Sequence, residues 1–483
     1  MRLVARLLGP LLFAAALLVD IPKLSAAGEA TLGIAAWVAL WWITDAIPMA
    51  ATALLPLILF PLCGVMPLKQ ATAAFANPII FLFLGGFLLA AAIERVRLHE
   101  RIALRIIYAL GSNWPRVLLG FMLATAFLSM WISNTATAVM MLPIGTAVYS
   151  QLRSEGEARL RMGRSLMLAI AYGCSIGGIA TLIGTPTNVI FSGMVTELYN
   201  VEIGFAQWLL FGLPFALLFL AAAWAYLAFV AFPVRAKGIP GGRAAVAGQL
   251  LQLGRMGYAE RAVLIVFVLT ALAWIIRPFL LARWLPGLND TIIALIAALS
   301  LFLLPSGKRD RRGILDWATA ENIPWGILLL FGGGLALAAG FTSSGLAEWI
   351  GLQLRTLQVL PLVFLLLGLI TAVNFLTEIT SNVATAAMLL PVLGALALAI
   401  DLHPYPLMVG ATLAASCAFM LPVATPPNAV VFGSGLLTIP QMLRAGLWLN
   451  VGSILLITAF VYWYLPWAWE FLAKGFPAEW LTK

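Results

Sequence analysis

Long apolar stretches recur along almost the whole 483-residue chain, and they constrain its fold more than any other feature. A helix needs roughly 20 apolar residues to cross a hydrocarbon core of about 30 Å. Hydrophobic residues make up 63% of the chain and charged residues only 10%, which is far from the balance of a water-soluble domain. The sequence therefore predicts an all-α, polytopic membrane protein, because helices satisfy their backbone hydrogen bonds in lipid. A cytosolic enzyme and a nucleic-acid-binding protein are both disfavoured.

The lengths of these stretches predict about 11 membrane helices plus two re-entrant hairpins. Several stretches exceed one span and carry Gly, Pro or polar residues near the middle, where a helix would break or turn back. The apolar stretches lie near residues 4–22, 32–64, 77–110, 116–149, 165–196, 205–232, 259–285, 288–304, 323–354, 358–400, 406–438 and 444–470.

The distribution of charge predicts the domain organisation and the topology. A polar, Gly- and Pro-containing segment at 233–258 separates an N-terminal half (1–232) from a C-terminal half (259–483). Lys and Arg residues cluster in this segment and in loops near 151–164 and 308–312. Cytoplasmic loops are enriched in such residues, so we expect a cytoplasmic linker and a cytoplasmic N-terminus. We recognise no targeting segment, which suits a bacterial inner membrane.

The two halves contain a sequence repeat. Ser133-Asn134-Thr135 recurs 248 residues later as Ser381-Asn382-Val383, and ten of the 17 positions in 127–143 match those in 375–391. Thr185-Pro186 recurs 240 residues later as Thr425-Pro426. On the predicted topology the first hairpin, 113–149, opens inside and the second, 358–400, opens outside. The repeat is therefore expected to be inverted, which is typical of a secondary transporter.

Polar tips and broken helices are the candidate binding elements. Each Ser-Asn pair lies at the centre of an apolar stretch, where the chain is expected to turn at mid-membrane depth. Pro186 and Pro426 are expected to break the stretches 165–196 and 406–438. A broken helix frees carbonyl groups that suit Na⁺ and N–H groups that suit an anion. The alternatives are polar patches that join packed helices and simple proline kinks.

Neither tip carries Lys or Arg, so hydroxyls, amides, helix ends and bound cations would have to hold an anion. Proton coupling is less favoured because few acids or histidines lie inside the apolar stretches. Glu378, beside the second tip, is interpreted as a structural partner that fixes the hairpin, with a direct role in coupling as the alternative. The basic stretch 95–105 is interpreted as an amphipathic helix at the cytoplasmic interface, with a lipid-binding patch as the alternative.

Several motifs resemble those of the divalent anion:sodium symporter family. They are the two tips, Thr377-Glu378, and the segments 42–48, 92–95, 98–104, 183–186 and 424–428. The resemblance implies a Na⁺-dependent carrier of di- or tricarboxylates or sulfate. It also implies a homodimer in which a scaffold domain holds a transport domain that moves like an elevator. Two positions depart from the family pattern, since Val383 replaces a hydroxyl residue and Asp45 stands where Glu is frequent.

The resemblance also implies the site residues. The first Na⁺ site would use Ser129, Ser133, Asn134 and the backbone near Gly184. The second would use Thr377, Thr380, Asn382 and the backbone near Ala424. The substrate would contact both tips and the second break, namely Ser133, Asn134, Thr135, Ser381, Asn382, Val383, Thr425 and Pro426.

The sequence therefore favours Na⁺-coupled symport of a divalent anion, most naturally a C4-dicarboxylate such as succinate, with membrane lipids as surroundings and no nucleic-acid partner. A Na⁺-independent dicarboxylate exchanger and a sulfate carrier remain alternatives on the same fold. An intramembrane enzyme is disfavoured because His99 and His403, the only histidines, form no convincing catalytic pair. A channel fits poorly with a binding site built from two inverted halves.

Overall fold

The computed structural model describes residues 2–110, 113–152, 155–234, 242–307 and 313–480. Within these ranges the regular structure is helical, and the β-structure is limited to two isolated bridges, Pro305 with Gly313 and Leu402 with Lys474. Eight of the described helical segments are long and apolar enough to cross a membrane, and five further apolar helices have 10–17 residues. The predicted all-α membrane fold is confirmed.

The N-terminal half contains the helices up to the π-helical segment η1. They are α1 (Arg2–Leu18), α2 (Ala26–Thr44), α3 (Met49–Thr52), α4 (Leu55–Leu62), α5 (Leu68–Phe75), α6 (Pro78–Arg95), α7 (Leu98–Leu110), α8 (Trp114–Ser129), α9 (Asn134–Ser150), α10 (Gly156–Ile179), α11 (Pro186–Tyr199), α12 (Phe205–Ala225) and η1 (Tyr226–Ala231).

The linker contributes one helix, and the C-terminal half contains the remainder. They are α13 (Gly242–Gln252), α14 (Tyr258–Ile276), η2 (Arg277–Leu281), α15 (Ala282–Trp284), α16 (Asp290–Leu303), α17 (Trp317–Ala320), α18 (Trp325–Ser343), α19 (Leu346–Leu354), η3 (Arg355–Val359), α20 (Leu362–Thr377), α21 (Asn382–Ala399), α22 (Pro404–Ser416), α23 (Pro426–Phe432), α24 (Ile439–Ala459), η4 (Phe460–Tyr464), α25 (Leu465–Ala468) and η5 (Ala478–Trp480).

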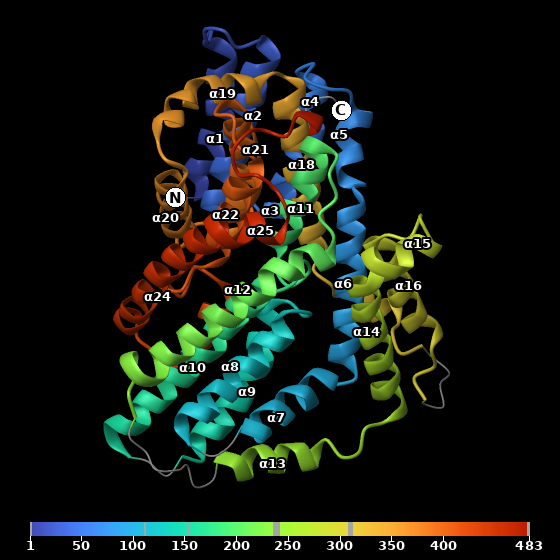
Figure 1. The fold of residues 1–483 in the computed structure, drawn as a ribbon, viewed down its shortest axis with the longest axis vertical. Helices are drawn as coiled ribbons and strands as arrows, with labels where there is room; N and C mark the ends of the chain where they lie inside the picture. Colours follow the sequence, from blue (N-terminus) through green and yellow to red (C-terminus); the bar gives the residue numbers. More distant parts are fainter. Residues whose placement is uncertain (1, 111–112, 153–154, 235–241, 308–312, 481–483) are drawn as a thin grey trace.

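Two helix pairs occupy the stretches predicted to be hairpins. The helices α8 and α9 are separated by four residues, and so are α20 and α21. Asn113 begins the first pair by accepting a hydrogen bond from Arg116 N, and Ser133 begins α9 by accepting one from Ala136 N. These caps satisfy N–H groups that a helix start would otherwise leave unpaired. In Figure 1, α8 and α9 open toward the lower end of the molecule, whereas α20 and α21 lie in its upper half.

The two stretches expected to be broken are each divided into two helices. The first break separates α10 from α11, and the second separates α22 from α23. Pro186 and Pro426 each occupy the first position of the helix that follows. Proline is favoured there because it lacks an N–H group that would in any case have no partner within the helix.

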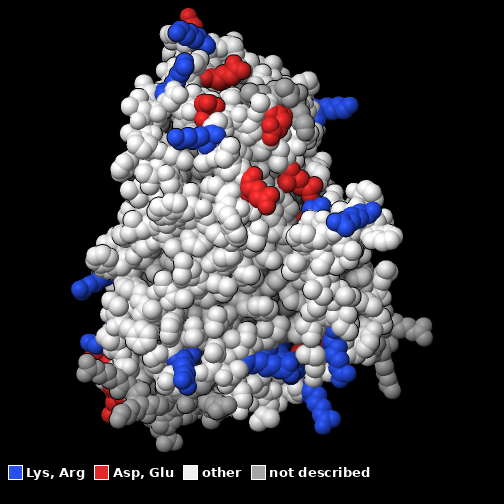
Figure 2. All heavy atoms as spheres, in the orientation of Figure 1, with Lys and Arg blue, Asp and Glu red and all other residues white. Residues whose placement is uncertain are grey.

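Charge is unevenly distributed between the two ends of the molecule. Figure 2 shows Lys and Arg side chains at both ends, whereas most Asp and Glu side chains visible on this face lie in the upper half. The helices α7 and α13 lie at the lower end, as do the start of α8 and the end of α9 (Figure 1). The linker therefore lies at the same end as the open end of the first hairpin.

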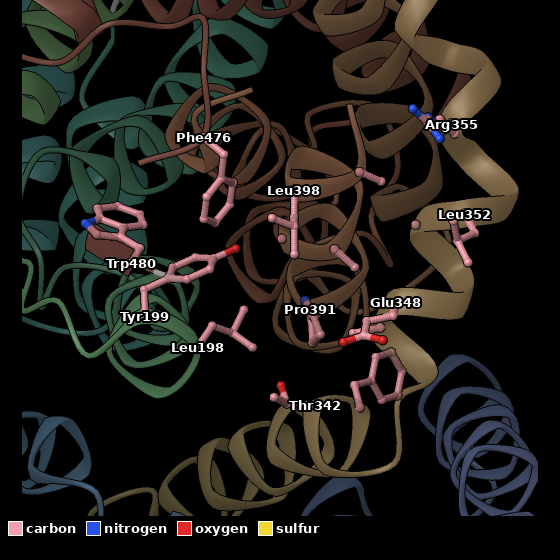
Figure 3. A pocket seen from close by; sticks show the side chains of 16 residues that line it. Leu198, Tyr199, Thr342, Glu348, Leu352, Arg355, Pro391, Leu398, Phe476 and Trp480 are labelled. Atoms are coloured by element: carbon pink, nitrogen blue, oxygen red, sulfur yellow. The ribbon is translucent and has the colours of Figure 1, made fainter. Parts of the chain in front are cut away.

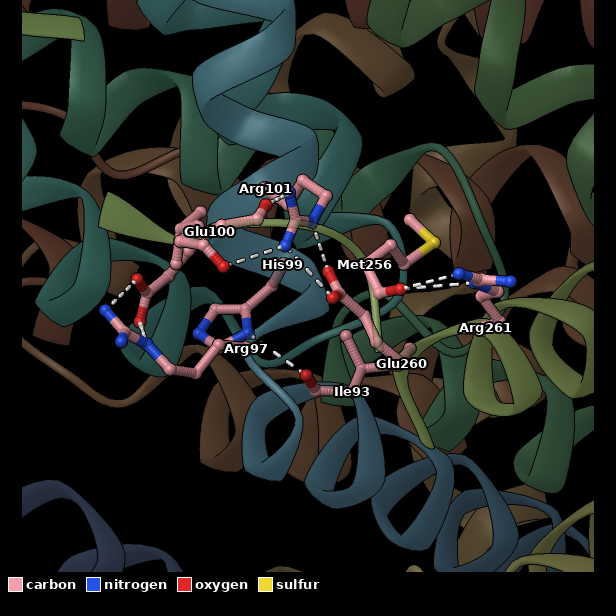
Figure 4. Close-up of polar contacts among 10 residues, drawn as sticks. Ile93, Arg97, His99, Glu100, Arg101, Met256, Glu260 and Arg261 are labelled. Carbon is pink, nitrogen blue, oxygen red and sulfur yellow. Dashed lines mark hydrogen bonds and ion pairs between the residues drawn. The ribbon is translucent and has the colours of Figure 1, made fainter. Parts of the chain in front are cut away.

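The basic stretch 95–105 does not form one exposed helical face. Arg97 has a left-handed backbone conformation, with a φ of 57°, and separates α6 from α7. Arg101 is buried, and its guanidinium contacts the Glu260 carboxylate at 3.1 Å and the Gly254 carbonyl oxygen at 2.9 Å (Figure 4). Arg101 therefore lies on the buried face of α7, where a cation requires a paired anion. This ion pair fixes α7 to the linker and to the start of α14. The amphipathic helix at the cytoplasmic interface stays a prediction.

Candidate functional site

The first tip is joined to the first broken helix by hydrogen bonds. The buried Ser129 hydroxyl lies 2.6 Å from Asn134 Oδ1 and 2.8 Å from the Cys174 carbonyl oxygen, so it connects the end of α8, the start of α9 and the C-terminal part of α10. Ser133 caps α9, and Asn134 is its first residue. Several oxygen atoms thus converge where the chain reverses.

The second tip repeats this arrangement with equivalent atoms. The Thr377 hydroxyl lies 2.8 Å from Asn382 Oδ1 and 3.0 Å from the Ala415 carbonyl oxygen. Thr377 and Asn382 stand 248 residues after Ser129 and Asn134, which is the offset of the sequence repeat. Both tips therefore present a hydroxyl, an amide oxygen and a backbone carbonyl in the same bonding pattern.

An asparagine in each broken helix braces the break, and the sequence reasoning did not assign either of them to the site. Asn188 Nδ2 donates to the Thr181 carbonyl at 2.8 Å, and it also lies 3.3 Å from the Gly178 carbonyl oxygen. Asn428 Nδ2 donates to the Leu421 carbonyl at 3.0 Å and to the Ala418 carbonyl at 3.2 Å. Both asparagines are fully buried. Their position two residues after Pro in both Thr-Pro motifs is the signal that identifies them.

Small residues let the first tip approach the first break. A Cβ atom added to Gly178 would lie 2.6 Å from Asn134 Oδ1 and 3.1 Å from the Gly184 carbonyl oxygen. A Cβ atom on Gly184 would lie 2.4 Å from the Gly178 carbonyl oxygen. Real Cβ atoms do not come this close to other atoms, so glycine is required at both positions. The glycines place the Asn134 amide beside the Gly184 backbone.

Glu378 organises the second break. Its Oε1 accepts hydrogen bonds from Phe419 N at 2.8 Å, Met420 N at 3.0 Å and Asn450 Nδ2 at 2.7 Å, and its Oε2 accepts one from Leu421 N at 3.1 Å. The side chain is buried. Four donors surround a group that acts only as an acceptor when ionised. Glu378 therefore fixes the irregular backbone that precedes α23.

The remaining predicted residues occupy positions around these clusters. Thr380 shares a hydrogen bond of 2.7 Å with Thr385. Thr425 caps α23 by accepting from Asn428 N at 3.3 Å, and the neighbouring Ala424 is buried. Half-buried residues of the second tip are Ser381, Asn382 and Val383, whereas Pro426 is exposed.

The two halves meet at their broken helices. The Thr187 hydroxyl, in the first turn of α11, lies 2.6 Å from the Ser416 hydroxyl at the end of α22. The helix α9 packs against α23, and α11 packs against α21. Each hairpin therefore contacts the broken helix of the other half, which brings both tips into one region of the molecule.

A cavity of about 710 Å³ reaches the first tip from one side. Ser133 and Thr135 line it, opposite residues of α6 and the segment around Asn322. Arg95 lines it too, and its guanidinium lies 2.6 Å from the Asp316 carboxylate and 2.8 Å from the Thr319 hydroxyl. Arg95 and Thr319 hold the pKa of Asp316 well below its usual range, so this pair stays ionised at physiological pH.

A second cavity, of about 590 Å³, lies away from both tips. Figure 3 shows Tyr199, Trp480 and Phe476 on one side of it and Glu348 on α19 on the other. Apolar residues of α21, among them Pro391 and Leu398, form its floor. None of the predicted site residues lines this cavity. The cavity beside Ser133 and Thr135 is therefore the candidate route to the site.

Comparison with known proteins identifies the family. Residues 2–472 match the model of the sodium:sulfate symporter transmembrane region. The chain belongs to this family. It is 48% identical over 476 residues to the sodium-dependent dicarboxylate transporter SdcS of Staphylococcus saprophyticus, covering 96% of this chain and 92% of SdcS. It is 45% identical over 475 residues to SdcS of Staphylococcus aureus (strain USA300), covering 96% and 91%. The resemblance seen in the motifs is confirmed, and the protein is an integral membrane protein of a transporter family.

Solved structures of more distant transporters share the fold. The YdaH transporter of Alcanivorax borkumensis aligns with a TM-score of 0.59 at 14% identity, covering 83% of this chain and 88% of that one. MtrF of Neisseria gonorrhoeae aligns with a TM-score of 0.57 at 13% identity, covering 84% and 85%. At such low identity the similarity establishes the architecture alone.

Proposed function

We propose that this protein is a secondary transporter that couples the movement of Na⁺ to symport of a C4-dicarboxylate such as succinate. The observation that carries the proposal is the repeated cluster of hydroxyl, amide and carbonyl oxygens at the two tips. The relatives named as sodium-dependent dicarboxylate transporters, at 45–48% identity over nearly the whole chain, support the same assignment. Interrupted helices that supply carbonyls to a cation are typical of Na⁺-coupled carriers.

Each tip would hold one Na⁺. Ser129, Ser133, Asn134 and the Gly184 backbone would form the first cation site, and the close approach at Gly178 supports this grouping. Thr377, Thr380, Asn382 and the Ala424 backbone would form the second. Both sites lack carboxylates among these residues, so each would bind a monovalent cation through oxygen dipoles.

The dicarboxylate would bind between the two tips. The side chains proposed to contact it are all uncharged, namely Ser133, Asn134, Thr135, Ser381, Asn382, Val383, Thr425 and Pro426. Its two negative charges would therefore be balanced by bound Na⁺ and by the N-terminal ends of α9, α21 and α23. This arrangement makes substrate binding conditional on Na⁺, which is the physical basis of coupling. A dianion carried with two Na⁺ moves no net charge, whereas a third Na⁺ makes transport electrogenic.

The proposal extends to the wider organisation of the protein. The N-terminal half (1–232) and the C-terminal half (259–483) would form an inverted repeat, with the first hairpin opening to the cytoplasm. The protein would be a homodimer with an elevator-type transport domain. Its N-terminus would be cytoplasmic, and its host membrane would be a bacterial inner membrane. The cavity that reaches Ser133 and Thr135 is also lined by Glu94 and Arg95 at the end of α6, directly before α7, so this conformation would be open to the cytoplasm.

Uptake of labelled succinate into proteoliposomes tests the function. We expect uptake to require an inward Na⁺ gradient and to be abolished by Asn134→Ala and by Asn382→Ala. Asn289→Ala is a matched control, because Asn289 also caps a helix, α16, but lies outside the site. If uptake does not depend on Na⁺ but requires dicarboxylate inside the proteoliposomes, the protein is an exchanger and the symport assignment is wrong.

Sulfate is a second candidate substrate, because the family description names it. Competition decides between the two anions. If sulfate displaces labelled succinate at equal or lower concentration than unlabelled succinate, the dicarboxylate assignment is wrong.

A further inference from the structure

Three arginines line a cavity of about 500 Å³ that is separate from the candidate transport site. Arg161 and Arg164 come from the first three turns of α10, and Arg444 comes from the second turn of α24. The segment η1, which follows α12, closes the third side. Figure 1 shows α10, α12 and α24 converging toward the lower left corner of the molecule. This corner lies at the same end as the linker helix.

The cavity carries an excess of positive charge. Among the described residues that line it Glu157 is the only acid, and it contacts Arg164 at 3.0 Å and Arg161 at 3.5 Å. One carboxylate therefore faces three guanidinium groups. Arg164 is largely buried, with a side chain that is 19% exposed, and its Nε has no hydrogen-bond partner among the described residues. Arg444 forms no ion pair within the described part of the chain.

The type of cation also matters for the ligand. Arginine suits a phosphate better than lysine does, because its guanidinium can donate two parallel hydrogen bonds to the phosphate oxygens. The cavity thus has the chemistry of a phosphate site with free donor capacity.

The rim of the cavity is apolar and faces outward. Val230 and Trp448 line the cavity and are 68% and 62% exposed. The neighbouring Phe229 is exposed as well, and Leu455 continues the face of Trp448 two turns along α24. These residues belong to the segments Phe205–Ala231 and Ile439–Ala468, which are long and apolar enough to cross a membrane. Acyl chains are the natural neighbours of such a surface.

We propose that this cavity binds the headgroup of an anionic glycerophospholipid, whose phosphate contacts Arg161, Arg164 and Arg444 and whose acyl chains lie on the face formed by Phe229, Trp448 and Leu455. A basic pocket between membrane helices, continuous with an exposed apolar surface, fits a phospholipid better than a soluble anion. The bound lipid would fasten α10, η1 and α24 together at the membrane surface.

The test measures lipid binding to the full-length protein purified in detergent. Native mass spectrometry and thermal unfolding would be followed while phosphatidylglycerol or phosphatidylcholine is added. The variant carries Arg161→Gln, Arg164→Gln and Arg444→Gln. The matched control carries Arg105→Gln, Arg116→Gln and Arg255→Gln, which replace three exposed arginines outside the cavity.

We expect phosphatidylglycerol to bind and stabilise the wild type and the control, and to bind the cavity variant roughly a hundredfold more weakly. If the triple variant does not fold, Arg444→Gln alone, at an exposed position, should weaken binding about fivefold. Equal affinity of the variant and the control for phosphatidylglycerol overturns the proposal. Stabilisation of the wild type by inorganic phosphate alone, to the same extent as by phosphatidylglycerol, overturns the lipid assignment.

Discussion

Replacing Glu378 by Gln should impair the second cation site without unfolding the protein. Glu378 accepts four hydrogen bonds, three of them from successive backbone N–H groups at 419–421. Glutamine keeps the size of the side chain but exchanges one oxygen for an NH₂ group. Its best orientation retains the three donors at Oε1 and turns the NH₂ toward Leu421 N, which then faces another donor.

The free-energy cost of this substitution follows from the number of hydrogen bonds that it weakens. A hydrogen bond to a charged acceptor contributes about 1 kcal/mol more than one to a neutral acceptor, so three weakened bonds cost about 3 kcal/mol. The unpaired Leu421 N–H adds about 1–3 kcal/mol. The total, on the order of 4–6 kcal/mol, acts on the backbone that leads to Ala424, a proposed ligand of the second Na⁺. A loss of about 1.4 kcal/mol in Na⁺ binding, a fraction of this total, is enough to raise the Na⁺ concentration for half-maximal uptake tenfold, so we expect a rise of at least that size.

The assay is succinate uptake by proteoliposomes as a function of Na⁺ concentration, together with thermal unfolding in detergent with and without Na⁺. Glu348→Gln is the matched control, because Glu348 is exposed and lines the other cavity. A Glu378→Gln variant that folds and keeps the wild-type Na⁺ dependence would refute the reasoning.

Three further predictions concern buried polar side chains and their effect on stability. Asn188→Leu and Asn428→Leu should each lower the free energy of unfolding by about 2–3 kcal/mol, because each removes at least two hydrogen bonds to carbonyls at a break; unchanged thermal unfolding in either variant would contradict this. Arg101→Gln should lower the free energy of unfolding by about 3–5 kcal/mol, because Glu260 would stay buried without its cation. The double variant Arg101→Met with Glu260→Leu should recover much of that loss. A double variant no more stable than the single one argues against this reasoning. His403 lies in the loop before α22, and burial lowers its pKa to about 4. The unfolded chain, with a His pKa of about 6.5, then binds more protons between these values, so stability should fall as pH drops from about 6.5 to 4. His403→Gln should flatten that part of a plot of unfolding temperature against pH, and an equally steep plot would count against this role.

Much of the site could be predicted from the sequence because it depends on local rules. Ser and Asn are preferred at helix starts, and proline is favoured in the first turn of a helix, so both motifs favour the start of a new helix. The recurrence of both motifs also indicated which residues correspond between the halves. The hydrogen bonds of Ser129 with Asn134, and of Thr377 with Asn382, span five residues and are therefore local as well.

Other features depended on residues far apart in the sequence. The burial of Arg101 was not predicted, because nothing in its own segment indicates that Glu260 lies beside it. The bracing roles of Asn188 and Asn428 were missed because their acceptors are carbonyl groups, which every residue possesses. The basic cavity combines α10, η1 and α24, whose residues are separated by more than 60 positions along the chain.

The sequence by itself determined the class of solvent, the helical fold, the places where helices break and the residue types at those breaks, since these follow from hydrophobicity and backbone chemistry along the chain. Only the tertiary structure decided which carbonyls each amide reaches, how Glu378 is surrounded by donors and which arginines share a cavity. The physical reason is that a buried polar group must find its partner wherever packing places one, and distance along the chain does not specify that partner.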